Sequence, residues 1–252
     1  MITRRAFISS LGYAAMSYRM GITIPGTTGA QAGIPAGIGT SADYEGPLPS
    51  SGTLGKVPAL KAEVRVAQSI LGGAPAGPTP FNVARYFLDV GSGKLNKEWQ
   101  PYVRGWPERW NPVIVTFFEA TATKPEGDLT SWCAAFLNWC FVQAGKGPAT
   151  HSASSGSFRS FGKATTHPVP GDIVVFKSAK QELADQGRGH VGFFLADHGA
   201  QVEVLGGNQI EGHERSHMID IKRLAKHSNA LVLHSYRTDA FLHAENVLGL
   251  DF

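Results

Sequence analysis

The chain has 252 residues, of which 42% are hydrophobic and 17% are charged, and its formal net charge is +3. Its first 32 residues hold three arginines and no acidic residue, so the remaining residues carry 20 basic and 20 acidic side chains. A balanced charge without a basic tail gives no reason to expect binding to nucleic acid.

The first 32 residues are typical of an export signal. Thr3-Arg4-Arg5-Ala6-Phe7-Ile8 resembles the twin-arginine signal, and Ala30-Gln31-Ala32 fits a cleavage site made of small residues. Arg19 interrupts the apolar stretch between them, which argues against a membrane-spanning helix and stable membrane insertion. We expect residues 1–32 to be a twin-arginine-type signal peptide and the protein to be periplasmic or extracellular. The alternative is a disordered basic start.

The rest of the chain divides by composition. Residues 33–58 are rich in Gly, Pro, Ser and Thr and show no apolar period, which predicts a linker. Residues 59–252 have a globular composition and are long enough for one domain with a substantial core. We expect the centre of this domain to span residues about 80–237.

The first half of this domain predicts helices. The sequence favours amphipathic helices at 59–72 and 81–90, an irregular tryptophan-rich stretch at 97–110, and a buried helix from 131 to 144. Residues 113–121 are strand-like in propensity, although a helix that begins at Pro112 is equally possible.

The second half predicts strands. A long polar connection leads to five segments with strand composition, at 173–177, 190–195, 201–205, 217–222 and 230–236. Short loops join most of them, as expected for an antiparallel meander. Helices followed by such strands predict an α+β domain with an antiparallel sheet of about five strands.

Both cysteines lie in the predicted helix, at Cys133 and Cys140. Seven residues of helix rise about 10.5 Å, whereas a disulfide needs Cα atoms within about 7 Å. The pair therefore cannot form a disulfide in an intact helix. The spacing is also unsuited to zinc, which usually takes Cys-x-x-Cys pairs. Asp128, Thr130 and Ser131 are candidate caps of this helix.

The two cysteines are expected to differ in reactivity. Cys133 lies in the first helical turn, where free N–H groups stabilise a thiolate. Cys140 stands between Trp139 and Phe141, as a small buried apolar residue does. Exported proteins rarely keep a lone thiol, and catalysis is one reason to keep it. We therefore expect Cys133 to be the working thiol.

A thiol nucleophile needs an imidazole and a group that orients it. His190 opens a predicted strand between Gly189 and Gly192, where another backbone or a substrate can approach closely. The next strand ends in Gly-Gly followed by Asn208, and antiparallel pairing brings that end beside His190. Asn208 is therefore the candidate orienting residue, and the alternative is a plain turn residue.

Four motifs in this order resemble the CHAP-type amidases and peptidases, of the NlpC-like group in the papain-like superfamily. The motifs are D-L-T-S-W-C-A-A-F-L-N-W-C, V-P-G-D-I-V-V-F, G-H-V-G-F-F and V-L-G-G-N-Q. The resemblance implies a papain-like fold with the nucleophile at the N-terminus of a helix packed on the sheet. It implies Cys133, His190 and Asn208 as the catalytic residues.

The same resemblance implies the substrate and the chemistry. It implies peptidoglycan, with hydrolysis of an amide bond through an acyl-enzyme and no metal or other cofactor. The backbone N–H of Cys133 is then the leading oxyanion donor. Trp132 and Gln209 are candidate substrate contacts, although Trp132 fits the core equally well. Residues 151–160 are a candidate substrate wall, and we expect a monomer.

Two alternatives belong to other classes. Residues 213–217 read H-E-R-S-H, which matches the zinc-peptidase pattern His-Glu-x-x-His. That pattern works on a helix, whereas the alternation that follows predicts a strand. The other alternative is a non-catalytic module that binds the cell wall, which requires Cys133 to be unreactive.

Overall fold

The computed structural model describes residues 57–128, 130–211 and 216–243. All of them belong to one compact unit of the chain, Gly33–Phe252. The predicted signal peptide and nearly all of the predicted linker lie outside the described residues, so both remain predictions.

The first half of the described chain is helical, as the sequence predicts. Its elements are α1 (Lys61–Gly73), α2 (Pro80–Gly91), the 3-10 helix η3 (Lys97–Val103), α3 (Pro112–Phe117), the 3-10 turn η4 (Phe118–Ala120) and α4 (Cys133–Gln143). Residues 112–117 adopt the helical alternative. The Asn111 side chain accepts from the Val113 N–H, and Pro112 occupies the first turn. This cap and proline outweigh the strand propensity of Val-Ile-Val.

The second half forms one antiparallel sheet of six strands. The strands are β1 (Lys163–Thr165), β2 (Ile173–Ser178), β3 (Gly189–Asp197), β4 (Gln201–Glu211), β5 (Ser216–Ala225) and β6 (Leu231–Thr238), in the order β1-β6-β2-β3-β4-β5. All five predicted strands are confirmed. The sequence analysis missed β1, a three-residue edge strand that pairs with β6, as well as three short helical pieces. These are η5 (Ser155–Ser160), α5 (Gln181–Asp185) and η6 (Ala240–Leu242).

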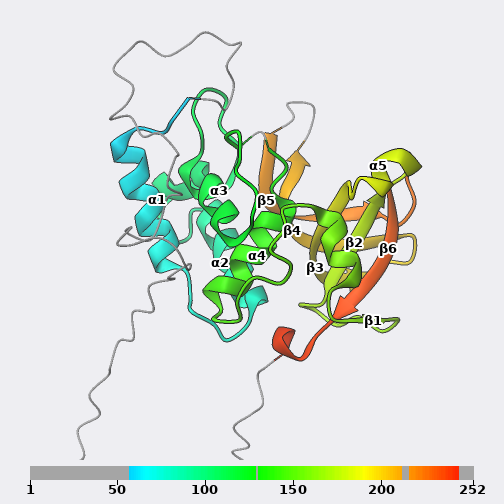
Figure 1. Ribbon diagram of the computed structural model, residues 1–252. Coiled ribbons are helices and arrows are strands. Elements are labelled where there is room, and N and C mark those ends of the chain that lie inside the picture. The colour runs from blue at the N-terminus through cyan, green and yellow to red at the C-terminus, as the bar shows by residue number, and fades with distance from the viewer. Residues whose placement is uncertain (1–56, 129, 212–215, 244–252) are drawn as a thin grey trace, which may run out of the picture. The chain divides into compact units, whose positions relative to one another are not determined.

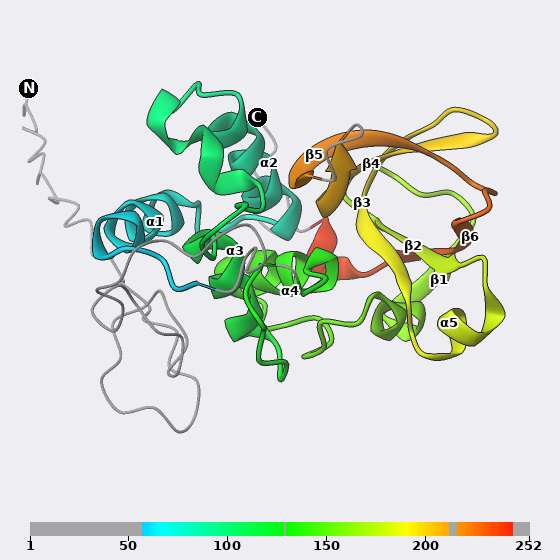
Figure 2. The ribbon, with the colours of Figure 1, turned by 90° about the horizontal axis from the view of Figure 1, so that it is seen from above.

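Helix α4 is the contact between the two halves. It packs against α2 and η4 on one side and against β3 and β4 on the other, so it lies between the other helices and the sheet (Figure 1 and Figure 2). From Cys133 to Phe141 every residue of α4 is buried. The domain is therefore α+β, with the cysteine helix at its centre.

The two faces of the sheet carry separate apolar clusters. Residues such as Val175, Val191 and Phe193 join the main core beneath α4. Alternate residues point the other way, and Phe176 and Val204 belong to a smaller cluster.

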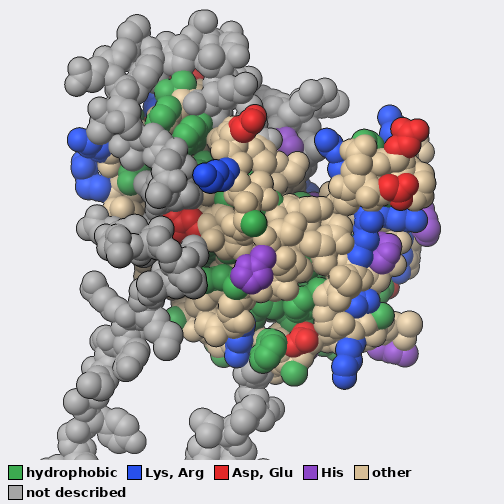
Figure 3. Space-filling model, in the orientation of Figure 1, with side chains coloured by type: hydrophobic (Ala, Val, Ile, Leu, Met, Phe, Trp, Pro, Cys, Tyr) green, Lys and Arg blue, Asp and Glu red, His purple; other side chains and the backbone are tan. Residues whose placement is uncertain are grey.

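The surface carries charges of both signs. On the face in Figure 3, Lys, Arg, Asp and Glu side chains are interspersed over the part that is not grey. Among residues 57–128, 130–211 and 216–243, none of the helices has the length and hydropathy needed to cross a bilayer.

Candidate functional site

Cys133 is the first residue of α4, at the position that the sequence predicts. The residue before it, Trp132, is the N-cap and makes no capping hydrogen bond through its side chain. The three expected caps do not cap this helix. Asp128 instead accepts from the N–H groups of Trp106 and Asn111, at 2.9 and 3.0 Å. The first N–H groups of α4 therefore stay available to the Cys133 thiol and its surroundings.

The Cys133 thiol is buried, and only 3% of the residue is exposed. Burial raises the pKa of Cys133 to about 11, against the opposing effect of the N–H groups of Val191, Ala134 and Cys133 itself. We expected the helix start to lower this pKa. The local effect has that sign, but desolvation outweighs it. The hydrogen bond from the Val191 N–H also places the thiol against β3, at the residue after His190.

Cys140 is a second free thiol and is fully buried. Burial raises its pKa well above the ordinary value, and no hydrogen bond opposes that shift. Its neighbours Trp139 and Phe141 are buried as well. Cys140 is therefore a core residue, as the sequence predicts.

His190 is buried in β3, opposite Phe176 of β2. Burial lowers the pKa of His190 to about 4. Its Nε2 atom is buried and has no hydrogen-bond partner. Among the described residues, the His190 ring forms no hydrogen bond with the Cys133 thiol. The two residues are close through the β3 backbone, and both are neutral near pH 7.

The G-G-N-Q motif forms an irregular bulge in β4. Gly206 pairs with Asp220 of β5 and Gln209 pairs with Met218, so Gly207 and the next residue have no partner. Asn208 adopts a left-handed backbone with φ 59°, which asparagine tolerates better than most residues. The bulge thereby turns the chain where β4 passes the start of α4.

Asn208 is half-buried, and its backbone forms a hydrogen bond with His217 of β5. Its backbone group raises the pKa of His217, although burial of that ring has the larger and opposite effect. Among the described residues, Asn208 makes no side-chain hydrogen bond to His190. Its assignment as the orienting residue therefore stays a prediction.

Each glycine of the bulge leaves room for a site residue. A Cβ atom on Gly206 would lie 3.3 Å from Nε2 of His190. One on Gly207 would lie 2.4 Å from the indole ring of Trp132. The bulge therefore fits closely against the residue before Cys133 and against His190, which joins three of the four sequence motifs in space.

The two expected substrate contacts are both buried. Trp132 is 0% exposed and packs against the ring of Phe117, with the centroids 6.2 Å apart. Gln209 is 4% exposed, and its amide nitrogen donates to backbone carbonyls of β4 and β5. In this conformation neither side chain lines an open surface, so the core alternative for Trp132 describes the structure.

The loop expected as a substrate wall is held between the two halves of the site. Asn138, one turn beyond Cys133 in α4, accepts from the Thr150 N–H at 2.8 Å and donates to the Ser152 carbonyl at 3.0 Å. At its other end, the Gly156 N–H donates to the Gly187 carbonyl just before β3. Sequence analysis missed Asn138, and an Asn inside an otherwise apolar helix was the available signal.

Asp128 organises the segment that contains Trp106 and Asn111. The residue is 3% exposed, and burial raises the pKa of its carboxyl group to about 6 in spite of the two N–H donors. The same segment also bonds to β5, because the Gly105 N–H donates to the His217 carbonyl at 2.7 Å. Asp128 thereby fixes the segment that approaches the edge of the sheet.

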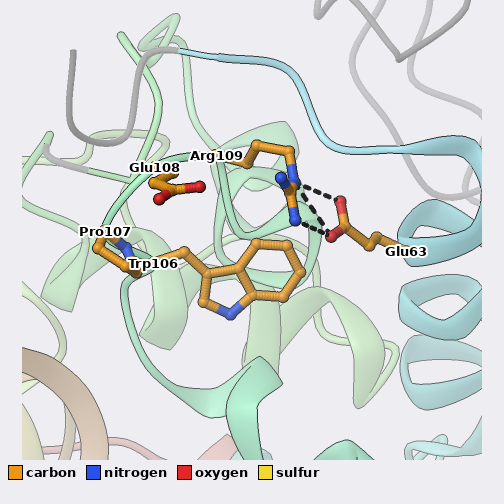
Figure 4. Close-up of a pocket in the computed structure, with 5 residues that line it drawn as sticks. All are labelled: Glu63, Trp106, Pro107, Glu108 and Arg109. Carbon is orange, nitrogen blue, oxygen red and sulfur yellow. Dashed lines mark hydrogen bonds and ion pairs between the residues drawn. The ribbon is translucent and has the colours of Figure 1, made fainter. Parts of the chain in front are cut away.

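This segment also borders a shallow hollow, shown in Figure 4. Glu63, Trp106, Pro107, Glu108 and Arg109 line it. Arg109 and Glu63 form a two-pronged ion pair with a shortest distance of 2.6 Å, and Glu63 also accepts from the Leu60 N–H at the start of α1. These charges hold α1 to the loop, and the hollow contains none of the predicted site residues.

The zinc-peptidase alternative receives no support from the described half of its pattern. His217 lies in the strand β5, where the sequence predicts it, and His213 lies outside the described residues. Within the parts of the chain that the structure describes, no three His, Cys, Asp or Glu side chains are grouped to hold a metal.

Comparison with protein families gives one match. The family model of the CHAP domain matches residues 125–208. This segment contains α4, β2, β3 and most of β4, and with them Cys133, His190 and Asn208. Searches of curated proteins and of solved structures find no match. The resemblance seen in the sequence motifs is thus confirmed for residues 125–208, the segment that matches the CHAP family model.

Proposed function

We propose that this protein is an exported cysteine hydrolase that cuts amide bonds in bacterial peptidoglycan. CHAP domains in general are associated with amidases and peptidases that act on peptidoglycan. The observation that carries the proposal is the position of Cys133 at the start of α4, with its thiol against the β3 residue that follows His190. Free N–H groups at a helix start can serve both a thiolate and an oxyanion.

The reaction would proceed by acyl transfer. His190 removes the thiol proton as the Cys133 sulfur attacks the amide carbonyl, and the N–H of Cys133 stabilises the resulting oxyanion. The C–N bond then breaks, and the imidazolium gives its proton to the leaving amine. Water, deprotonated by His190, attacks the thioester, and the returning proton restores the thiol. The enzyme ends unchanged, with one amide bond replaced by an amine and a carboxylic acid.

The burial of the site adds a requirement to this mechanism. The pKa of Cys133, about 11, and that of His190, about 4, keep both groups neutral at pH 7. A buried neutral pair cannot exchange a proton cheaply until polar groups approach it. We infer that substrate binding opens the site and brings the amide carbonyl and solvent to the thiol. Residues 150–156, which bond to Asn138 at one end and to Gly187 at the other, are the segment whose movement would do this.

Hydrolysis of purified peptidoglycan tests the proposal. The wild-type chain should release soluble fragments from dye-labelled sacculi, and Cys133→Ala should release none. Cys140→Ala, a change in the same helix, is the matched control and should remain active. A zinc chelator should have no effect, whereas a metallopeptidase would stop. If Cys133→Ala binds sacculi as wild type does and wild type cuts nothing, the non-catalytic binding module is the better account.

A further inference from the structure

Two unpartnered polar atoms lie around Gly206. Nε2 of His190 and Oε1 of Gln209 are both buried without a hydrogen-bond partner. A Cβ atom built on Gly206 would lie 3.3 Å from Nε2 of His190 and 3.5 Å from the amide nitrogen of Gln209. The absence of a side chain at residue 206 thus leaves a small space that the imidazole and the amide share.

The orientation of the Gln209 amide is fixed by its other contacts. Its nitrogen donates to the carbonyls of Val204 and Gly206 in β4, at 3.2 and 3.4 Å, and of Asp220 in β5, at 2.5 Å. Turning the amide over would place its oxygen against three carbonyl oxygens. Oε1 is therefore the atom left over, and it can only accept a hydrogen bond.

We propose that Gln209 is the positioning residue of the CHAP site, and that its Oε1 accepts the hydrogen on Nε2 of His190, directly or through one water beside Gly206. A single donor and a single acceptor thereby satisfy each other, as buried polar groups normally do. The proposal rests on the proposed function, in that the oriented imidazole is the base that serves Cys133.

The arrangement has a consequence for the imidazole. With its hydrogen held on Nε2, the neutral ring of His190 has an unprotonated Nδ1, which is the nitrogen that can take the thiol proton. Burial lowers the pKa of His190 to about 4, so the neutral ring predominates at pH 7. Gln209 thus replaces Asn208 as the residue that selects the tautomer, and the left-handed backbone of Asn208 serves to shape the bulge.

Nitrogen NMR of the wild-type chain tests this directly. With ¹⁵N-labelled histidine, long-range proton–nitrogen spectra distinguish the Nε2–H and Nδ1–H tautomers at pH 7, and His190→Gln identifies the signal among the nine histidines. The proposal predicts the Nε2–H tautomer. The Nδ1–H tautomer would overturn it, and this result needs no variant at position 209.

Two variants then separate positioning from support of the sheet. Gln209→Met keeps the length of the side chain and removes its acceptor. Gln143→Met is the matched control, because Gln143 also donates its amide to a backbone carbonyl, that of Ala74, at 2.9 Å. Gln209→Met should mix the His190 tautomers and slow alkylation of Cys133 at pH 7 by about 100-fold, as misplaced catalytic groups do. Gln143→Met should change neither.

The remaining outcomes also decide the matter. In Asn208→Gly, His190 should keep the Nε2–H tautomer. If the tautomer is lost in this variant, Asn208 and not Gln209 is the positioning residue. If Gln209→Met is folded by circular dichroism and keeps both the tautomer and the alkylation rate, the proposal is wrong. If it fails to fold, the wild-type tautomer decides. Absence of peptidoglycan hydrolysis together with an Nε2–H tautomer would contradict the function and leave the Gln209 contact standing.

Discussion

Gly207 of the bulge lies directly against the indole ring of Trp132. A Cβ atom at this position would be 2.4 Å from Cζ3 and 2.8 Å from Cε3 of that ring, and 3.0 Å from Cβ of Phe136. Real Cβ atoms do not approach other carbons so closely. Since Trp132 precedes Cys133 and is fully buried, this contact sets how β4 packs on the start of α4.

Gly207→Ala should therefore destabilise the domain. The added methyl must displace Trp132 or the bulge, and overpacking of this kind costs about 1–3 kcal/mol. The control is Gly72→Ala, at a helical glycine of α1 where a Cβ would meet no atom within 4 Å. That change should stabilise by up to about 1 kcal/mol, since Ala favours helix. Urea denaturation measures both, and equal stability of Gly207→Ala and wild type would refute the packing argument.

The two cysteines should separate cleanly in thiol chemistry. Iodoacetamide near neutral pH should modify Cys133 before Cys140, because N–H groups favour the thiolate of Cys133 while Cys140 has only the opposing effect of burial. Loss of peptidoglycan hydrolysis should follow the modification of Cys133. Cys140→Ala should stay active and lose about 1 kcal/mol of stability to the small cavity. Peptide mapping by mass spectrometry reports the order, and the reverse order would contradict the assignment.

Acid should destabilise the fold through His190. The pKa of this ring falls from 6.5 to about 4 on folding, so the unfolded chain binds the proton more readily. The stability gained by staying neutral is complete above pH 6.5 and is lost as the pH falls through 4, and it amounts to about 3 kcal/mol.

The matched comparison is with His190→Gln. Buried carboxyl groups such as Asp128 and Glu119, whose pKa values are raised, titrate in the same range in wild type and variant. The free energy of unfolding of wild type, relative to that of His190→Gln, should therefore fall by about 3 kcal/mol between pH 7 and pH 4. A constant difference across this range would show that His190 is not desolvated.

Asp128 should give the opposite pH dependence. Burial raises its pKa from 3.8 to about 6, so its favourable contribution is present below pH 3.8 and is lost as the pH rises through 6. Asp128→Asn keeps an oxygen for the N–H groups of Trp106 and Asn111 and carries no charge. Its stability relative to wild type should rise by about 3 kcal/mol between pH 3 and pH 8. A difference that falls with pH would argue against the buried carboxylate.

Export can be tested without activity. Arg4→Lys/Arg5→Lys should retain the precursor in the cytoplasm, because the twin-arginine route requires the arginine pair. Arg19→Lys preserves the pair and the charge and should be exported normally. Cell fractionation followed by immunoblotting measures both. Normal secretion of the double variant would refute a twin-arginine signal.

Much of the fold follows from local signals in the sequence. Pro80 and Thr79 mark the start of α2, and short apolar runs or alternating apolar residues mark β2 to β6. Residues 113–117 were ambiguous, since their propensity favours a strand while the cap at Asn111 favours a helix. Strand β1 was missed because its three residues carry little pattern and depend on pairing with β6, which lies far along the chain.

The position of Cys133 at the start of a helix could be predicted from the sequence, but the electrostatics around it could not. Helix position places Cys133 at the first turn, but the sign of its net pKa shift depends on burial, which no local pattern reveals. The role of Asp128 was mistaken for a cap because its partners, Trp106 and Asn111, are 22 and 17 residues away. Gln209 likewise shows its contacts only once β4 and β5 are paired.

Mass spectrometry of peptidoglycan digests tests the central claim most directly. Purified sacculi are incubated with the wild-type chain or with Cys133→Ala, and the soluble products are sequenced. We predict products with newly freed amine and carboxyl ends at one type of amide bond, in the peptide or at the sugar–peptide junction, with wild type only. The same new ends from Cys133→Ala, or cleavage confined to glycosidic bonds, would contradict a cysteine amidase.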